Sequence, residues 1–176
     1  PMKPPLHNIR CLFTDIDDTM STDGKITEEA YQALWRAQEA GLVVVPVTGR
    51  PAGWCDHIAR MWPVGGVIGE NGGLYMRMTG QGLQCVYRYD ADTRAGFQKR
   101  LQQIREEILA KVPGCGIASD QPYREYDLAI DISEDVPPLS PEAVAEIVRI
   151  FESHGATAKV SSVHVNGWFG DFDKLT

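Results

Sequence analysis

Residues 11–19 read Cys11-Leu12-Phe13-Thr14-Asp15-Ile16-Asp17-Asp18-Thr19, an apolar run that ends in three carboxylates and a threonine. A short apolar run of this kind predicts a parallel strand that is buried on both faces. Burying an ionised carboxylate is costly unless it is paired or binds a metal, so we expect the aspartates just past the carboxyl end of the strand. Ligands bind at that edge of a doubly wound sheet, and the stretch therefore predicts where the chemistry takes place.

The residues that follow predict a βαβ unit. Thr27, ahead of two glutamates, signals the start of a helix, and the β-branched run 42–48 predicts a second buried strand with Pro46 at its end. A second helix is expected to open at Thr48-Gly49-Arg50-Pro51, and a third strand over 64–68 to end in a tight turn at Glu70-Asn71-Gly72-Gly73. The fold class is therefore α/β, with a Rossmann-like, doubly wound parallel sheet as its core.

The pattern changes near residue 81, from short buried strands to alternating strands and longer helices. The expected elements are strands over 83–89, 126–132 and 157–165 and helices over 93–112 and 142–154. The second of these helices is expected to have Ser140 as its N-cap and Pro141 at its first position. This pattern is typical of an α+β module. We expect residues 1–80 and 168–176 to form the core domain and residues 81–167 to form an inserted α/β cap domain.

Composition narrows the classes of partner. The chain has 17 basic and 24 acidic residues and a formal charge of −7, which argues against nucleic acid as the main partner. The cysteines, Cys11, Cys55, Cys85 and Cys115, have no metal-ligand spacing and are expected to be reduced. No apolar run approaches the ~20 residues that span a bilayer, so we expect a cytoplasmic protein without a membrane partner. The oligomeric state is not readable from the sequence.

Asp15, Asp17 and Thr48 are the first candidate site residues. Two neighbouring carboxylates at a strand end suit a hard cation such as Mg²⁺, and they equally suit a nucleophile with an adjacent acid/base. Thr48 and Gly49, at a helix N-terminus, offer a hydroxyl and N–H groups to an anion, and Lys174 could add positive charge. The alternative is structural, since aspartates form turns and a threonine alone is most simply a helix cap.

These motifs resemble those of one family. Asp15-Ile16-Asp17-Asp18-Thr19 resembles the D-x-D-x-T signature of the haloacid dehalogenase superfamily of phosphohydrolases, and Val47-Thr48-Gly49-Arg50 resembles its second motif. Glu70-Asn71-Gly72-Gly73 is similar to a segment of the branch that includes sucrose-phosphate, mannosyl-3-phosphoglycerate and Cof-type phosphatases. That branch carries its α/β cap domain between motifs two and three, and Lys174 lies where the third-motif lysine belongs.

The resemblance implies a Mg²⁺-dependent phosphatase of a small phosphomonoester, with sugar phosphates as the expected substrates. Asp15 would be the nucleophile, and Asp17 would act as acid and base while its backbone carbonyl binds the metal beside Asp15. Thr48, Gly49 and Lys174 would bind the phosphoryl group. Arg50 is a candidate substrate contact or the partner of an acid at the helix start, and Asn71 is a second candidate substrate contact.

The family's fourth motif, an acidic segment that completes the metal site, does not occur before Thr176. The resemblance therefore implies that residues 1–176 alone are inactive or crippled. Two alternatives stay open, a phosphosugar mutase with the same nucleophile and, if the fourth motif is truly absent, a non-catalytic binding module. Dinucleotide binding is disfavoured, because Gly114-Cys115-Gly116 lacks the last glycine of the fingerprint.

Overall fold

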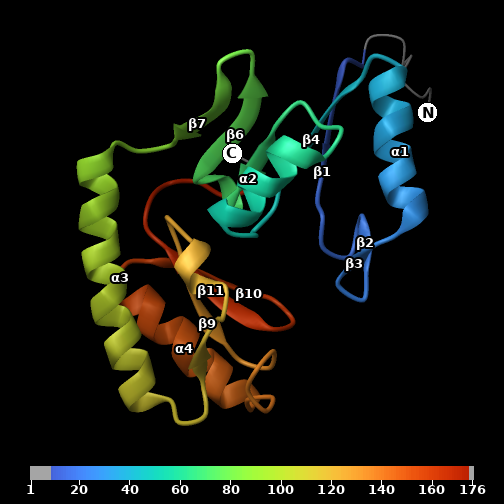
Figure 1. The fold of residues 1–176 in the computed structure, drawn as a ribbon. Coiled ribbons are helices and arrows are strands. Elements are labelled where there is room, and N and C mark those ends of the chain that lie inside the picture. The colour runs from blue at the N-terminus through green and yellow to red at the C-terminus, as the bar shows by residue number, and fades with distance from the viewer. Residues whose placement is uncertain (1–8, 175–176) are drawn as a thin grey trace, which may run out of the picture. The chain divides into compact units, whose positions relative to one another are not determined.

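The computed structural model describes residues 9–174, which divide into two compact units. Unit 1 contains residues 9–88 together with residues 173 and 174, and unit 2 contains Tyr89–Phe172. Figure 1 shows that each unit has its own sheet and its own helices. All the candidate site residues belong to unit 1.

Unit 1 is built on a mixed sheet. Strand β1 (Cys11–Thr14) pairs in parallel with β4 (Val43–Pro46), and a parallel bridge from Val47 to Ile68 links β4 to β5 (Val67–Gly69). The antiparallel strands β6 (Leu74–Thr79) and β7 (Gly82–Tyr87) follow β5 in the same sheet. Pro46 is the last residue of β4, where a missing N–H does the least damage to a ladder. The predicted α/β class is confirmed.

Two helices and a small hairpin complete unit 1. Helix α1 (Glu28–Glu39) begins as predicted, because the Thr27 hydroxyl accepts the N–H of Ala30. Helix α2 (Ala52–Met61) begins directly after the predicted opening segment, with Pro51 as its N-cap. Strands β2 (Ser21–Thr22) and β3 (Lys25–Ile26) form the hairpin after the aspartates. Leu34 of α1 packs on Val44 and Met20 in one apolar cluster.

The prediction that the first strand is buried on both faces was wrong. In β1, Leu12 is 46% exposed and Phe13 is 61% exposed, whereas Val44 in the neighbouring strand is 1% exposed. The cause is its position in the sheet. Within residues 9–174, β1 pairs only with β4, and the apolar cluster beneath α1 is built around Val44 rather than around β1. An apolar run predicts a strand but does not reveal its neighbours.

The β6–β7 hairpin lies across the predicted boundary between core and cap domains. The two strands pair from Leu74 with Tyr87 to Thr79 with Gly82, so the expected boundary at residues 80 and 81 falls in their turn. The chain instead passes from unit 1 to unit 2 after Arg88 and returns at Asp173. That unit 2 acts as a cap domain stays a prediction.

Unit 2 is an antiparallel sheet with two helices. Its strand order is β10 (Thr157–Val160), β11 (His164–Trp168), β9 (Leu128–Asp131) and β8 (Gly116–Ile117). Helices α3 (Ala91–Lys111) and α4 (Pro141–Ser153) supply Ile104, Ile147 and Phe151 to an apolar core that also contains Ile130 and Val165 from the sheet. Ser140 caps α4 and Pro141 is its first residue, as predicted. Figure 1 shows both helices packed beside this sheet.

The polar side chains of β9 are buried as well as its apolar ones. Asp127, just before the strand, is fully buried, and Asp131 is 1% exposed. Asp127 accepts bonds from Arg124 Nη1 and Asn166 Nδ2, both at 2.9 Å, and Asp131 accepts three backbone N–H groups, from residues 133–135. Unit 2 therefore contains a satisfied polar layer next to its apolar core.

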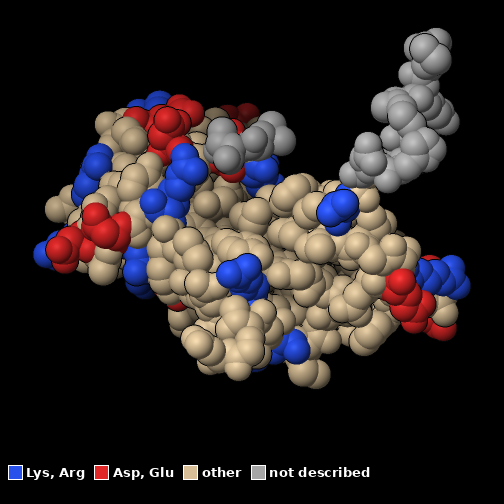
Figure 2. Space-filling model, turned by 90° about the horizontal axis from the view of Figure 1, so that it is seen from above, with Lys and Arg blue, Asp and Glu red and all other residues tan. Residues whose placement is uncertain are grey.

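Charged side chains are scattered over the surface in small groups. On the face that Figure 2 shows, acidic and basic side chains are interspersed and no continuous basic patch is visible. Within the described part of the chain, no helix combines the length and the apolar character needed to cross a membrane. The four cysteines are all free thiols, as predicted.

Candidate functional site at the strand ends of unit 1

The parallel pairing of β1 and β4 brings the two main motifs to one edge of the sheet. Thr14 lies opposite Pro46, and the N–H of Val47 donates to the Thr14 carbonyl at 2.7 Å. Residues 15–17 and residues 48–50 therefore leave neighbouring strands at the same end. This is the carboxyl edge, where the sequence predicts the chemistry.

Asp15 lies between a backbone donor and a lysine. Its Oδ1 accepts the N–H of Ile16 at 2.8 Å, and its Oδ2 accepts Lys174 Nζ at 2.8 Å. Both side chains stay partly open to solvent, at 39% exposure for Asp15 and 22% for Lys174. The structure thus joins two predicted site residues that are 159 positions apart in the chain.

Asp17 is held by Arg50. The Arg50 Nη2 lies 2.6 Å from Asp17 Oδ1, and its Nε lies 3.1 and 3.2 Å from the two carboxylate oxygens. The guanidinium also lies over the ring of Trp54, with its Cζ 4.5 Å from the ring centroid. Of the two interpretations of Arg50, the structure shows the acid partner. Trp54 belongs to α2, and no sequence motif pointed to this contact.

Thr48, two residues after the end of β4, is fully buried. Its N–H donates to the Ile68 carbonyl and its own carbonyl accepts the N–H of Asn71, so both backbone groups are engaged. The hydroxyl oxygen accepts the N–H of Arg50 at 3.0 Å. Because a hydroxyl can donate and accept at once, this bond orients its hydrogen while leaving it able to donate to an anion.

The turn after β5 supports the motif at Thr48. It is the 3₁₀ turn η2 (Glu70–Gly72), in which Glu70 and Asn71 both have positive φ, at 46° and 58°. Such a conformation costs roughly 1–2 kcal/mol for a residue other than glycine, and it often marks a functional loop. Asn71 is 4% exposed, and its Oδ1 would lie 3.1 Å from a Cβ at Gly49. The side chain of Asn71 therefore borders the anion-site candidate.

Glu70 has a role that the sequence motif did not reveal. Its side chain is fully buried, and its Oε1 accepts the N–H of Ala52 at 2.9 Å, at the N-terminus of α2. The carboxylate thus caps a helix that begins outside its own segment, and it complements the positive end of the helix dipole. The sequence showed only that a glutamate follows a strand, and this does not reveal which helix the glutamate caps.

The loop after Asp17 winds around one carbonyl group. The Ile16 oxygen accepts N–H groups from Thr19, Met20 and Ser21, and Asp18 adopts a positive φ of 57°. This tight loop turns the chain away from the strand edge directly after the two aspartates.

A cavity of about 370 Å³ lies beside Lys174 and is lined by residues of β5, β6 and β7.

The described residues contain no group of three or more His, Cys, Asp or Glu side chains arranged to hold a metal ion. Asp15 remains as a half-exposed carboxylate, and Asp17 has its own carboxylate engaged by Arg50. Carboxylate and carbonyl oxygens are ligands that suit Mg²⁺, which commonly keeps several waters. The donor set at residues 15 and 17 therefore fits a magnesium ion bound with few protein ligands.

Several solved structures share this fold. Protein 0175 of Thermoplasma acidophilum matches with a TM-score of 0.71 and 20% identity, over 96% of this chain and 68% of that one. The C-terminal domain of trehalose-6-phosphate phosphatase from C. albicans matches at 0.68 and 13%, over 94% and 59%. A subclass IIB sugar phosphatase of the haloacid dehalogenase superfamily matches at 0.57 and 15%, over 94% and 72%. At these identities the likeness concerns the fold.

The sequence comparisons identify the family. No curated protein matches the chain, but a family model described as haloacid dehalogenase-like hydrolase matches residues 12–108. The match covers more than half of the chain, and it includes Asp15, Asp17, Thr48 and Arg50. The resemblance seen in the motifs is thereby confirmed, and the chain belongs to the family of haloacid dehalogenase-like hydrolases.

Proposed function

We propose that this protein hydrolyses a small phosphomonoester through a phosphoryl group carried on Asp15, and that its substrate is a sugar phosphate. The observation that carries the proposal is the contact between Asp15 Oδ2 and Lys174 Nζ at 2.8 Å, at the edge where two strand-end motifs meet. A carboxylate that is partly open to solvent can be reached by a phosphate group, and the neighbouring cation offsets the negative charge of both. Two of the structural relatives are named as phosphatases of sugar phosphates, which supports the substrate class.

In the proposed reaction, an oxygen of Asp15 forms a bond to phosphorus while the bond from phosphorus to the alcohol oxygen breaks. Lys174 neutralises charge on Asp15 and on the phosphoryl oxygens, which is the main service a protein supplies to phosphoryl transfer. The Thr48 hydroxyl, oriented by its bond from the Arg50 N–H, donates to a phosphoryl oxygen. The Gly49 N–H is assigned the same role.

Asp17 is assigned the proton transfers. It gives a proton to the departing alcohol oxygen and then takes one from the water that attacks the aspartyl phosphate, which restores Asp15 and releases inorganic phosphate. Arg50 positions this carboxylate, and the Trp54 ring in turn lies against the Arg50 guanidinium. Arg50 and Asn71 are also the proposed contacts to the rest of the substrate. Mg²⁺, when bound by Asp15 and the Asp17 carbonyl, would offset negative charge on the phosphate.

The experiment measures the phosphorylated protein directly. Samples of the protein are mixed with radiolabelled sugar phosphates and Mg²⁺, and label that is stable in acid and released by hydroxylamine is counted. We expect label on Asp15, its loss in Asp15→Asn and its retention in Asp56→Asn, a control carboxylate that pairs with Arg60 on α2. Chelation of the metal should reduce labelling.

Two results would overturn the proposal. Full labelling of Asp15→Asn would exclude Asp15 as the nucleophile, and the absence of label with every phosphomonoester tested would exclude phosphoryl transfer by this chain. Product analysis then separates the remaining alternatives. Release of inorganic phosphate indicates a phosphatase, whereas return of the label to a second position of the sugar indicates a mutase.

A further inference from the structure

Trp54 is an exposed aromatic side chain beside the candidate site. It lies in the first turn of α2 and is 45% exposed. A single exposed apolar side chain needs no explanation by itself, but this one touches a site residue. The Cζ atom of Arg50 lies 4.5 Å from the centroid of the Trp54 ring, and the same guanidinium holds Asp17. Trp54 is therefore one side chain away from the proposed acid and base.

The side chains of Asp17, Arg50 and Trp54 form a row that solvent can reach. In their ion pair Asp17 is 40% exposed and Arg50 is 23% exposed. Within residues 9–174, no hydrogen bond joins the indole N–H of Trp54 to another residue, whereas the N–H of the buried Trp168 donates to the Phe172 carbonyl at 3.1 Å. The indole N–H of Trp54 is therefore left for water or for a ligand.

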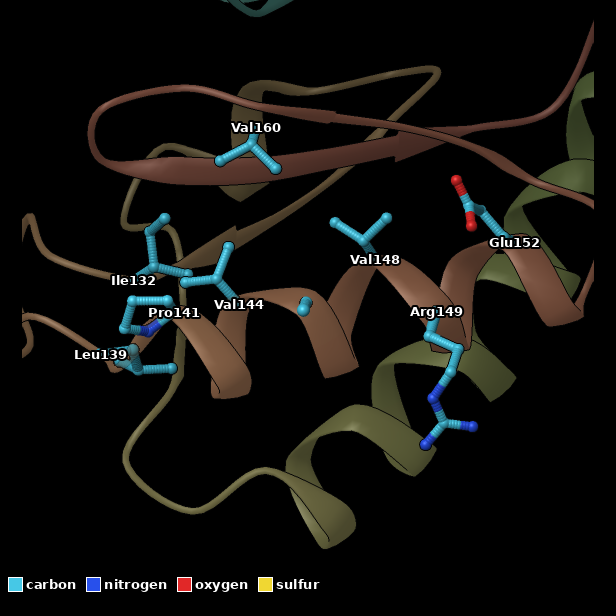
Figure 3. Close-up of a pocket in the computed structure, with 9 residues that line it drawn as sticks. Ile132, Leu139, Pro141, Val144, Val148, Arg149, Glu152 and Val160 are labelled. Atoms are coloured by element: carbon cyan, nitrogen blue, oxygen red, sulfur yellow. The ribbon is translucent and has the colours of Figure 1, made fainter.

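The cavity between α4 and β10 in unit 2 lacks this combination. It has a volume of about 740 Å³, and Figure 3 shows Val144 and Val148 rising from α4 toward Val160 on β10. No aromatic ring is among the described residues that line it, and its Arg149 is paired with Glu146 on the same helix. An aromatic ring beside a cation that is bound to a site carboxylate is thus a feature of unit 1.

The proposed reaction places the leaving group next to this row. Asp17 is assigned the proton that goes to the departing alcohol oxygen, so this oxygen must come within hydrogen-bond reach of the Asp17 carboxylate. Arg50 binds that carboxylate, and Trp54 lies against Arg50. The carbon skeleton attached to the alcohol oxygen is thereby brought to Arg50 and to the exposed ring of Trp54.

We propose that Trp54 is a specificity residue that packs against the ring of a cyclic sugar phosphate. The inference rests on the proposed function, because Asp17 locates the leaving group. The C–H groups of a sugar ring complement the negative face of an indole ring, and a sugar hydroxyl can accept the indole N–H. An acyclic alcohol presents no such face. The site should therefore prefer cyclic to acyclic phosphomonoesters.

The first test compares two substrates that release a similar primary alcohol. Glucose 6-phosphate carries a ring and glycerol 3-phosphate does not. The concentration dependence of Asp15 labelling gives a half-saturation concentration and a maximal rate for each. Trp54→Leu should raise the half-saturation concentration about tenfold for glucose 6-phosphate, which corresponds to one aromatic contact, and less than about twofold for glycerol 3-phosphate. Trp54→Tyr should restore most of the preference.

Trp35→Leu is the matched control. Trp35 is 47% exposed and lies on α1, which contributes no candidate site residue, so this variant should keep the preference of the parent protein. If Trp54 served only to hold Arg50, Trp54→Leu would lower the maximal rate with both substrates to the same extent. That result would overturn the proposal.

Binding to Asp15→Asn separates this inference from the proposed function. The variant lacks the proposed nucleophile, so equilibrium dialysis with the two radiolabelled ligands measures recognition without phosphoryl transfer. Adding Trp54→Leu to it should weaken binding of glucose 6-phosphate about tenfold and leave binding of glycerol 3-phosphate within about twofold. If the parent protein is never labelled but this difference is found, the proposed function falls and the recognition of the ring stands. Equal weakening of both ligands, or binding of neither, would overturn the inference whatever the labelling shows.

Discussion

Each unit contains a cluster of arginine–aspartate ion pairs, but the two clusters differ in their exposure to solvent. In unit 1, Asp17 is 40% exposed and Arg50 is 23% exposed in their ion pair. In unit 2, Arg124 bridges Asp120 and Asp127 with exposures of 3%, 15% and 0%. A buried pair must be satisfied within the protein, whereas a half-exposed pair can exchange its partner for a ligand. Burial thus separates the structural cluster of unit 2 from the cluster that we propose to be reactive in unit 1.

The electrostatics of Arg124 illustrate this difference. Burial lowers the pKa of the Arg124 guanidinium, but Asp127 and Asp120 outweigh that effect and hold the pKa above its ordinary value. The guanidinium therefore carries its charge at neutral pH. Asp127 is further tied to Asn166, so the cluster joins the segment before β9 to β11. Its function is to hold the polar layer of unit 2 together.

The largest expected effect comes from breaking the buried cluster. Asp127→Ala leaves Arg124 buried with one carboxylate partner fewer, and such a loss costs about 3–5 kcal/mol of unfolding free energy. Urea denaturation measures it. Asp56→Ala, which removes the exposed carboxylate of the Asp56–Arg60 pair on α2, is the matched control and should leave the denaturation midpoint almost unchanged. Equal effects of the two substitutions would refute the contrast between buried and exposed pairs.

Lys174→Gln should have the opposite effect, a large loss of reaction rate with little loss of stability. The proposed reaction loses a cation next to the phosphoryl group, so the rate of Asp15 phosphorylation should fall by about a hundredfold or more. Stability should change by less than about 1 kcal/mol, because the Lys174–Asp15 pair is partly exposed. Single-turnover labelling and urea denaturation on the same samples give both numbers. A stability loss as large as that of Asp127→Ala would show that the pair is structural.

The effect of replacing Glu70 should lie between these two, because Glu70 is buried but belongs to the unit that contains the candidate site. Glu70→Ala removes the carboxylate that accepts the Ala52 N–H, and loss of such a helix cap costs about 1–2 kcal/mol. Thermal unfolding should show the loss. Glu28→Ala, an exposed acid in the first turn of α1, is the control with a smaller expected shift.

The smallest effect concerns pH. Burial raises the pKa of Asp131, but the N–H groups of Glu134, Asp135 and Ser133 outweigh burial and lower the pKa below its ordinary 3.8. A depressed carboxylate pKa contributes stability above the ordinary value and loses it as pH falls toward the folded value. Unfolding free energies of the parent and of Asp131→Asn should therefore converge below pH 3.8. A difference that stays constant with pH would contradict this assignment.

Local patterns in the sequence predicted much of the fold. The caps at Thr27 and Ser140, the strand end at Pro46 and the separation into an α/β part and an α+β part depend on residues close together in the chain. The meeting of residues 15–17 with residues 48–50 was also predictable, because parallel strands end at the same edge. Lys174 was placed by resemblance to a family motif, and the structure adds its contact with Asp15.

Other features depend on neighbours that no local pattern names. The exposure of Phe13 follows from the place of β1 in the sheet, and the boundary of unit 1 follows from the pairing of β7 with β6. Arg50 had two equal interpretations until the folded chain brought Asp17 within 2.6 Å. The helix that Glu70 caps and the stacking of Trp54 on Arg50 likewise required the positions of segments distant in sequence.

The amino-acid sequence by itself determined which residue types stand at the strand ends, because hydrophobic periodicity and helix caps are local properties of the chain. It thereby determined the family and the candidate residues. Only the tertiary structure decided which charges are buried, which are paired and which remain open to a ligand. Solvent access and ion pairing depend on distances across the fold, and those distances arise only when the strands and helices pack together.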